Sequence, residues 1–328
     1  MSQRARTWTV SELLTWTRER FAQVGIEQPR VDAEHLLSLG LGCSRMDLYV
    51  QYDRLLTEDE RGPFRELVRR RLAREPVAYI TGTRGFHALD LDLEVDSRVL
   101  IPRPETEHLV DWVLEVLKDM SEGSPVVDIG TGSGAIALAI KRARPSQQVS
   151  ACDRSSGALD VARKNAVTAG LDVTFYESDL LEAVPLPSAG FAVVVSNPPY
   201  IRSQDLATLQ PEVQRFEPAL ALDGGSDGLD VIRRLIASCA RPGVLRPGGW
   251  LMLEVGAGQA PEVAELLDKN MYKHVEMRKD LAGILRVVGG QSPQTEAVEK
   301  LPPEPEIVEL DAVGEDIDPE LPVFSEEP

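Results

Sequence analysis

The sequence predicts an α/β protein whose main part is a doubly wound, Rossmann-like sheet of seven mostly parallel strands. A small helical domain precedes the sheet, and a β-hairpin joins the two. Three observations lead to this prediction. Apolar, β-branched runs alternate with helical segments after Ser124, a glycine-rich turn follows the first of these runs, and residues 9–75 show helical periodicity.

Changes in periodicity and composition divide the chain into four expected parts. Residues 1–76 form the helical domain, residues 77–100 the hairpin linker, and residues 101–290 the sheet domain. Residues 291–328 hold twelve acidic residues, seven prolines and one lysine, a composition typical of a disordered tail. This tail carries most of the net charge of −18, so the folded part is only mildly acidic.

Three amphipathic segments account for the helical domain. The first runs from Ser11, a potential N-cap, to Phe21, and the second covers Val31–Leu41. Thr57–Glu60 has the spacing of a capping box for a third helix that ends at Ala73. Five arginines lie on this third helix, and a sixth, Arg74, directly follows it. We interpret them as a solvated face, and a docking surface for an acidic or RNA-associated partner is the alternative.

The remaining elements are predicted from the alternation of apolar and polar residues and of strand-like and helical segments. The pattern from Tyr79 to Leu100 predicts the hairpin, and a helix over Leu109–Met120 follows it. Helices over Ala135–Ala143 and Ser156–Ala169 then separate the first strands. The predicted strands are Val126–Ile129, Val149–Asp153, Val173–Tyr176, Phe191–Ser196, Trp250–Val255, His274–Arg278 and Ile284–Val288.

Composition limits the class of protein. At 328 residues and 43% hydrophobic content, the chain has room for two domains and should fold. It has no signal sequence and no apolar run of membrane-spanning length, so we expect a cytoplasmic protein without a membrane partner. Cys43, Cys152 and Cys239 lie far apart without a metal-binding spacing, which indicates a reducing compartment and no bound metal.

A nucleoside-binding pocket is predicted where the first strand turns into its helix. The turn is Asp128-Ile129-Gly130-Thr131-Gly132-Ser133-Gly134, whose glycines allow a ligand to approach the backbone closely. Asp153, at the end of the second strand, can accept hydrogen bonds from ribose hydroxyls, or it can cap the next helix. Asp179, after the third strand, can accept from an adenine amino group or serve as a turn residue.

The glycine spacing favours S-adenosylmethionine over a dinucleotide as the ligand. The last glycine lies one residue too early for the dinucleotide fingerprint. In addition, the Asp128 carboxylate before the first glycine would repel a pyrophosphate, whereas it would attract a sulfonium or an ammonium group.

The most informative motif is Asn197-Pro198-Pro199-Tyr200, which ends the apolar run Phe191–Ser196. Neither proline can donate a backbone N–H, so carbonyl groups at this strand end are left without ladder partners. Together with the Asn197 amide, they suit a planar –NH₂ group, whose two hydrogens need two acceptors. A simple strand terminator is the alternative.

These motifs together resemble a class I S-adenosylmethionine-dependent methyltransferase. More narrowly, the chain is similar to the HemK/PrmC-type N(5)-glutamine methyltransferases of peptide chain release factors, from the helical region to about Gly290. The segments that carry the resemblance are Pro76–Gly82, Leu100–Glu107, Asp128–Gly134, Asn197–Tyr200, Glu217–Leu220 and Asp227–Leu229. Only the acidic tail lies outside the pattern of the family.

The resemblance implies a helical domain that helps to bind the release factor and a catalytic domain that binds S-adenosylmethionine. The implied substrate is the glutamine of the Gly-Gly-Gln loop of release factors, with no direct need for nucleic acid. We expect a monomer. The expected cofactor-binding residues are Asp128, Gly130, Thr131, Gly132, Gly134, Asp153, Asp179 and Asn197.

A mechanism by positioning follows from the residue types. A carboxamide nitrogen is a poor nucleophile, and no histidine stands near the motif to act as a base. We therefore expect the Asn197 oxygen and the Pro198 carbonyl to accept the two amide hydrogens, while Tyr200 packs on the amide. Asn197, Pro198 and Tyr200 are the expected catalytic residues, and Pro199 completes the substrate-binding set.

Two other functions use the same motifs. An adenine or cytosine amino-methyltransferase would hold a flipped base in the same way, but such enzymes need basic, aromatic-rich recognition surfaces. Here the folded part is acidic and aromatic residues make up only 5% of the chain. A non-catalytic scaffold that binds S-adenosylmethionine is the third possibility, and it would not require an intact Asn197–Tyr200 motif.

Overall fold

The computed structural model describes residues 7–87 and 91–292. Nearly all of the predicted acidic tail, residues 293–328, lies outside the described residues. The predicted seven-stranded, mostly parallel sheet is confirmed, as are the helical N-terminal region and the hairpin between them.

The N-terminal region is a set of helices around its own apolar core, which includes Phe21, Leu36 and Phe64. The predicted capping box of the third long helix is confirmed, since the Thr57 hydroxyl accepts from the backbone N–H of Glu60. The elements of the N-terminal region are β1 (Trp8–Thr9), α1 (Val10–Gln23), α2 (Pro29–Leu41), α3 (Arg45–Val50), β2 (Leu55–Leu56), α4 (Glu58–Leu72) and α5 (Val77–Thr81).

Two predicted helix starts are wrong. The first helix is capped by Thr9 and not by Ser11, because the side chain of Thr9 forms a complete capping box with Glu12. The helix expected over Leu109–Met120 is α6 (Pro104–Val116), which begins five residues earlier. Pro104 occupies its first turn, where the missing N–H of proline costs no hydrogen bond.

The linker differs in part from the expected hairpin. The strands β3 (Thr83–Phe86) and β4 (Leu91–Glu94) pair antiparallel, as predicted. The alternating residues before them instead form α5, which ends at Gly82 in the left-handed region at φ 76°. Here Tyr79 is buried against Val99, and its hydroxyl donates to the Val99 carbonyl at 2.5 Å.

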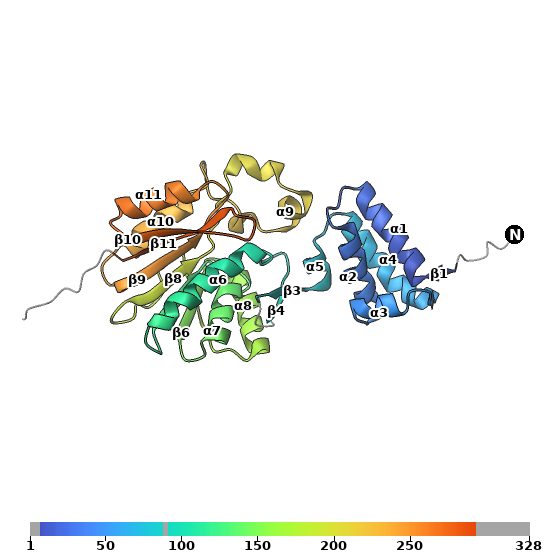
Figure 1. The fold of residues 1–328 in the computed structure, drawn as a ribbon, viewed down its shortest axis with the longest axis horizontal. Helices are drawn as coiled ribbons and strands as arrows, with labels where there is room; N and C mark the ends of the chain where they lie inside the picture. The colour runs from blue at the N-terminus through green and yellow to red at the C-terminus, as the bar shows by residue number, and fades with distance from the viewer. Residues whose placement is uncertain (1–6, 88–90, 293–328) are drawn as a thin grey trace, which may run out of the picture. The chain divides into compact units, whose positions relative to one another are not determined.

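The sheet runs in the order β10-β11-β9-β8-β5-β6-β7, with β11 antiparallel to both of its neighbours (Figure 1). Its strands are β5 (Pro125–Ile129), β6 (Gln148–Asp153), β7 (Thr174–Glu177), β8 (Phe191–Ser196), β9 (Leu245–Glu254), β10 (Lys273–Lys279) and β11 (Leu285–Gln291). Chain order reverses between β5 and β8, and a doubly wound sheet binds ligands at this switch point.

Helices cover both faces of the sheet. On one face, α6, α7 (Ala135–Ala143) and α8 (Ser156–Ala169) share a core with alternate strand residues such as Val126 and Val193. On the other face, α10 (Asp230–Cys239) and α11 (Ala260–Lys269) pack on the intervening residues, such as Val127 and Val194 (Figure 1). Every residue of β8 is therefore buried, as its continuous apolar sequence predicts.

One buried side chain ties the hairpin to the glycine-rich turn. Asn165 of α8 is 2% exposed, and its Oδ1 accepts from the backbone N–H of Glu94 at 2.7 Å. Its Nδ2 donates to the carbonyls of Glu94 and Ser133, at 3.0 and 2.9 Å. The Asn165 amide thus bonds the backbone of β4 as a neighbouring strand would, and it also holds the turn that precedes α7.

We expect Asn165→Ala to lower the free energy of unfolding by about 3 kcal/mol, because it leaves one buried and two partly buried backbone groups without this partner. Asn165→Asp, which keeps the shape but cannot donate to two carbonyls, should be nearly as destabilising. Urea denaturation measures both variants, with the exposed Thr168→Ala as the control. Wild-type stability of Asn165→Ala would contradict this account of the turn.

Candidate active site

Three parallel strands end side by side and deliver the predicted motifs to one edge. Ile129 of β5 pairs with Cys152 of β6 and with Ser196 of β8. The residues that follow these three positions are the glycine-rich turn, Asp153 and Asn197. Because carboxyl ends of parallel strands share one edge, segments far apart in the sequence meet here.

The glycine-rich turn is held by backbone bonds. Gly130, Gly132 and Gly134 all have left-handed φ angles, of 71°, 56° and 86°, which residues with side chains rarely adopt. The N–H groups of Gly130 and Thr131 both donate to the Cys152 carbonyl, at 2.9 and 3.0 Å. Gly130 and Gly132 consequently present bare backbone to the cavity beside them.

Asp128 lies beneath this turn and is completely buried. Its Oδ2 accepts from the Thr131 hydroxyl at 2.6 Å and from the Ala137 N–H at 3.3 Å, while Oδ1 has no partner among the described residues. Burial raises the pKa of Asp128 to about 7, and the bond from Thr131 opposes the rise. Asp128, Thr131 and Gly134 are not among the residues that line the cavity.

Asp153 lines the cavity and is oriented by the backbone on both sides of it. Its Oδ2 accepts from the Gly132 N–H and its Oδ1 from the Ser155 N–H, both at 2.9 Å. Burial raises the pKa of Asp153, and these backbone donors work against that rise. Each carboxylate oxygen keeps a further lone pair for a donor in the cavity.

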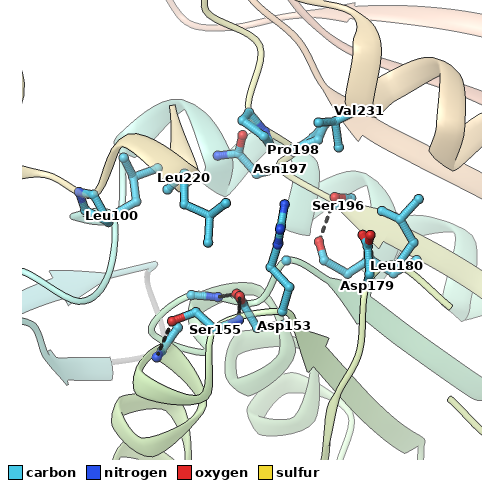
Figure 2. A pocket seen from close by; sticks show the side chains of 18 of the residues that line it. Leu100, Asp153, Ser155, Asp179, Leu180, Ser196, Asn197, Pro198, Leu220 and Val231 are labelled. Atoms are coloured by element: carbon cyan, nitrogen blue, oxygen red, sulfur yellow. Dashed lines mark hydrogen bonds between the residues drawn. The ribbon is translucent and has the colours of Figure 1, made fainter. Parts of the chain in front are cut away.

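Asn197 and Pro198 line the same cavity across from Asp153 (Figure 2). The Asn197 Nδ2 donates to the hydroxyl of Thr106 on α6 at 3.1 Å. Neither the Asn197 Oδ1 nor the Pro198 carbonyl accepts a hydrogen bond from the described residues. Two acceptors without partners therefore stand at the end of β8, as the motif predicts.

Tyr200 is partly buried and is held by groups of the sheet domain. Its hydroxyl donates to Oε1 of Glu254, at the end of β9, at 3.4 Å. Its backbone carbonyl accepts from Gln259 Nε2 at 3.0 Å, and the Ile201 N–H donates to the Leu222 carbonyl at 3.0 Å. A Cβ on Gly228 would lie 2.4 Å from the Tyr200 carbonyl, so only glycine fits there.

Asp179 also lines the cavity, but its carboxylate is already engaged. Its Oδ2 accepts from the Arg234 guanidinium of α10 at 2.8 Å. Leu180, the next residue, has a left-handed φ of 52°, and its carbonyl accepts from the Cys152 thiol at 3.1 Å. An adenine amino group would therefore share the Asp179 carboxylate with Arg234.

The sequence reasoning missed the apolar part of the cavity wall. Leu100 precedes α6, Leu220 lies in the short helix η3 (Ala219–Ala221), and Val231 lies in α10 (Figure 2). Leu100 and Leu220 belong to the segments Leu100–Glu107 and Glu217–Leu220. Both segments contribute to the resemblance to the family, but neither leucine was expected to line the site. The sequence does not mark these leucines as binding residues, since an isolated leucine is normally a core residue.

An ion pair joins these two segments across the cavity wall. The Arg103 guanidinium donates to Oε1 of Glu217 at 2.6 Å, and Oε2 accepts from the Ile101 N–H at 3.4 Å. The Glu217 side chain is 1% exposed and that of Arg103 is 31% exposed. Arg103 thus anchors the segment Glu217–Leu220 at the start of α6.

Comparison with known proteins supports the same assignment. Residues 12–82 match the PrmC N-terminal domain and residues 110–219 match the methyltransferase small domain. The chain is 44% identical to a release factor glutamine methyltransferase of Geobacter sulfurreducens, over 89% of this chain and 99% of the relative. A protein of the same name from Rhodopirellula baltica is 42% identical, over 87% of this chain and 96% of the relative.

The chain belongs to the release factor glutamine methyltransferase family. The catalytic domain of hMettl16, solved in complex with the MAT2A 3'UTR hairpin 1, has a TM-score of 0.53 to this family member at 16% identity. That match covers 64% of this chain and 77% of the other, and it shows that the methyltransferase fold is shared.

Three further observations concern the described residues of this methyltransferase. None of the helices within residues 7–87 and 91–292 has the length and apolar character needed to cross a bilayer. The same residues contain no group of three or more His, Cys, Asp or Glu side chains that could hold a metal ion. Cys43, Cys152 and Cys239 are free thiols.

We expect Arg103→Met to lower the free energy of unfolding by about 3 kcal/mol, because it leaves the buried Glu217 carboxylate without its cation. The double variant Arg103→Met/Glu217→Gln should recover a large part of this loss, since the buried charge is then removed. Urea denaturation of the wild type and both variants checks the expectation. If the double variant were as unstable as Arg103→Met, the ion pair would not be the cause.

Proposed function

We propose that this chain transfers a methyl group from S-adenosylmethionine to the side-chain amide nitrogen of the glutamine in the Gly-Gly-Gln loop of peptide chain release factors. The observation that carries the proposal is the pair of unengaged acceptors, Asn197 Oδ1 and the Pro198 carbonyl, at the end of β8. Membership of the family supports the choice of substrate.

The cavity has the features that S-adenosylmethionine requires. Gly130 and Gly132 offer a close backbone surface, and Asp153 offers oriented acceptors for the ribose hydroxyls. Leu100 and Leu220 supply apolar area for a flat base, and Asp179 an acceptor for its amino group. When bound, S-adenosylmethionine supplies an electrophilic methyl group on a positively charged sulfur.

The residues of the chain act on the glutamine by position. Asn197 Oδ1 and the Pro198 carbonyl accept one amide hydrogen each, which fixes the plane of the carboxamide and favours a more pyramidal nitrogen. These acceptors also stabilise the positive charge that develops on the nitrogen as its new bond forms. Because the glutamine nitrogen is held in one place, it reacts with the methyl donor as one of two prepositioned groups and not through a random collision.

General-base catalysis by histidine is not part of this proposal. His35, His87, His108 and His274 do not line the cavity. The nitrogen becomes strongly acidic once it carries the methyl group, so its excess proton can pass to water after the transfer. The work of the protein is therefore to orient the amide, not to deprotonate it beforehand.

We expect Asp153→Ala to weaken S-adenosylmethionine binding about 10- to 100-fold, because it removes a charged acceptor of ribose hydroxyls. Isothermal titration calorimetry measures the dissociation constant. Asp160→Ala, an exposed substitution on α8, is the matched control. Unchanged affinity in Asp153→Ala would rule out the ribose contact.

We expect Asn197→Ala to lower kcat at least about 100-fold while the affinity for S-adenosylmethionine changes little, because the lost acceptor serves the glutamine. Labelled S-adenosylmethionine and a purified release factor give the rate, and a release factor with Gly-Gly-Ala in place of Gly-Gly-Gln is the substrate control. Retained turnover in Asn197→Ala would overturn the assigned role.

The same assay separates the alternative functions. Transfer of label to DNA or RNA, with none to the release factor, would favour the amino-methyltransferase that acts on nucleic acid. Binding of S-adenosylmethionine without transfer to either would favour a non-catalytic scaffold. Transfer to the release factor that depends on its glutamine is the outcome that we expect.

A further inference from the structure

Among the described residues, the Asn197 side chain forms a hydrogen bond through only one of the two ends of its amide. Nδ2 donates to the Thr106 hydroxyl at 3.1 Å, and Thr106 is 4% exposed in the first turn of α6. The two ends of an amide are chemically different, since the nitrogen only donates and the oxygen only accepts. Holding Nδ2 at Thr106 therefore leaves Oδ1 as the end available to a ligand.

A buried carboxyl group lies behind Thr106. Glu254 is 1% exposed at the end of β9, against which α6 packs. Its Oε1 accepts from the Tyr200 hydroxyl, and its Oε2 accepts no hydrogen bond from the described residues. Burial raises the pKa of Glu254 to about 7, and an interaction with the Thr106 hydroxyl opposes the rise.

The three groups form a chain with one direction. A hydroxyl has a single proton, so a threonine that accepts from Asn197 directs its own proton to another acceptor. Glu254 lies on β9, against which α6 packs, and its Oε2 has no hydrogen-bond donor among the described residues. Glu254, Thr106 and Asn197 can thus form one chain, in which Asn197 Nδ2 donates to Thr106 and Oδ1 is left without a donor among the described residues.

We propose that Thr106 and Glu254 are positioning residues that hold Asn197 with Oδ1, and not Nδ2, toward the carboxamide substrate. The inference rests on the proposed function, because it explains how the site selects an –NH₂ group. If the Asn197 amide were reversed, its N–H groups would face the hydrogens of the substrate amide and repel them. Glu254 also binds Tyr200, so one buried side chain orders both ends of the motif.

The test compares two substitutions of nearly the same shape. Thr106→Val removes the hydroxyl, and we expect kcat to fall about 10- to 100-fold while KM for the release factor and the dissociation constant of S-adenosylmethionine change less than about twofold. Thr106→Ser restores the hydroxyl and should recover kcat to within about threefold of the wild type. Thr168→Val, at an exposed position of α8, is the matched control.

A second readout does not depend on any substrate. In ¹⁵N-labelled protein, the Nδ2 protons of Asn197 should give one signal that is protected from exchange in the wild type and in Thr106→Ser. The protection should disappear in Thr106→Val. Wild-type kcat in Thr106→Val, or unchanged Asn197 signals in that variant, would overturn the proposal.

Glu254→Gln gives an independent test if Thr106→Val does not fold. A neutral amide accepts more weakly than a carboxylate, so we expect about a tenfold fall in kcat and faster exchange of the Asn197 protons. Wild-type values of both would overturn the role of Glu254. If the wild-type protein did not methylate release factors, the proposed function would be wrong. The exchange of the Asn197 Nδ2 protons would still show whether Thr106 and Glu254 hold the Asn197 amide.

Discussion

The site depends on the parallel pairing of three central strands. Because β5 pairs with β6 on one side and β8 on the other, Ile129, Cys152 and Ser196 end the strands at one level. This pairing brings together the turn, the acid and the amide that follow them, and the Gly132 N–H of the turn then donates to Asp153. A one-residue change in register would place each of these groups on the opposite face of the sheet.

Buried carboxyl groups surround this edge, and each is tied to a different segment of the site. Asp128 holds the glycine-rich turn, Glu217 anchors Arg103, and Glu254 binds Tyr200. A buried acid is costly unless donors satisfy it, so such groups impose a narrow choice of geometry on their neighbours.

Much of the fold could be predicted because local signals agreed with the global packing. The β8 strand was predicted with its observed bounds, since six buried residues followed by two prolines leave little choice. Errors occurred where neighbouring signals competed. Thr9 and Ser11 are both good caps, and only Thr9 has glutamate at the required spacing. The helix expected from Leu109 begins at Pro104, because proline fits the first turn of a helix as well as it fits a loop.

The sequence by itself determined the order of strands and helices, the turn that offers bare backbone, and the two acceptors after β8, because these are properties of consecutive residues. Only the tertiary structure decided which distant groups complete the site. Glu254 lies 57 positions beyond Asn197 and Thr106 lies 91 positions before it, yet Thr106 binds the Asn197 amide and Glu254 binds Tyr200 of the same motif. Such neighbours are set by the packing of α6 on β9, and no local pattern encodes them.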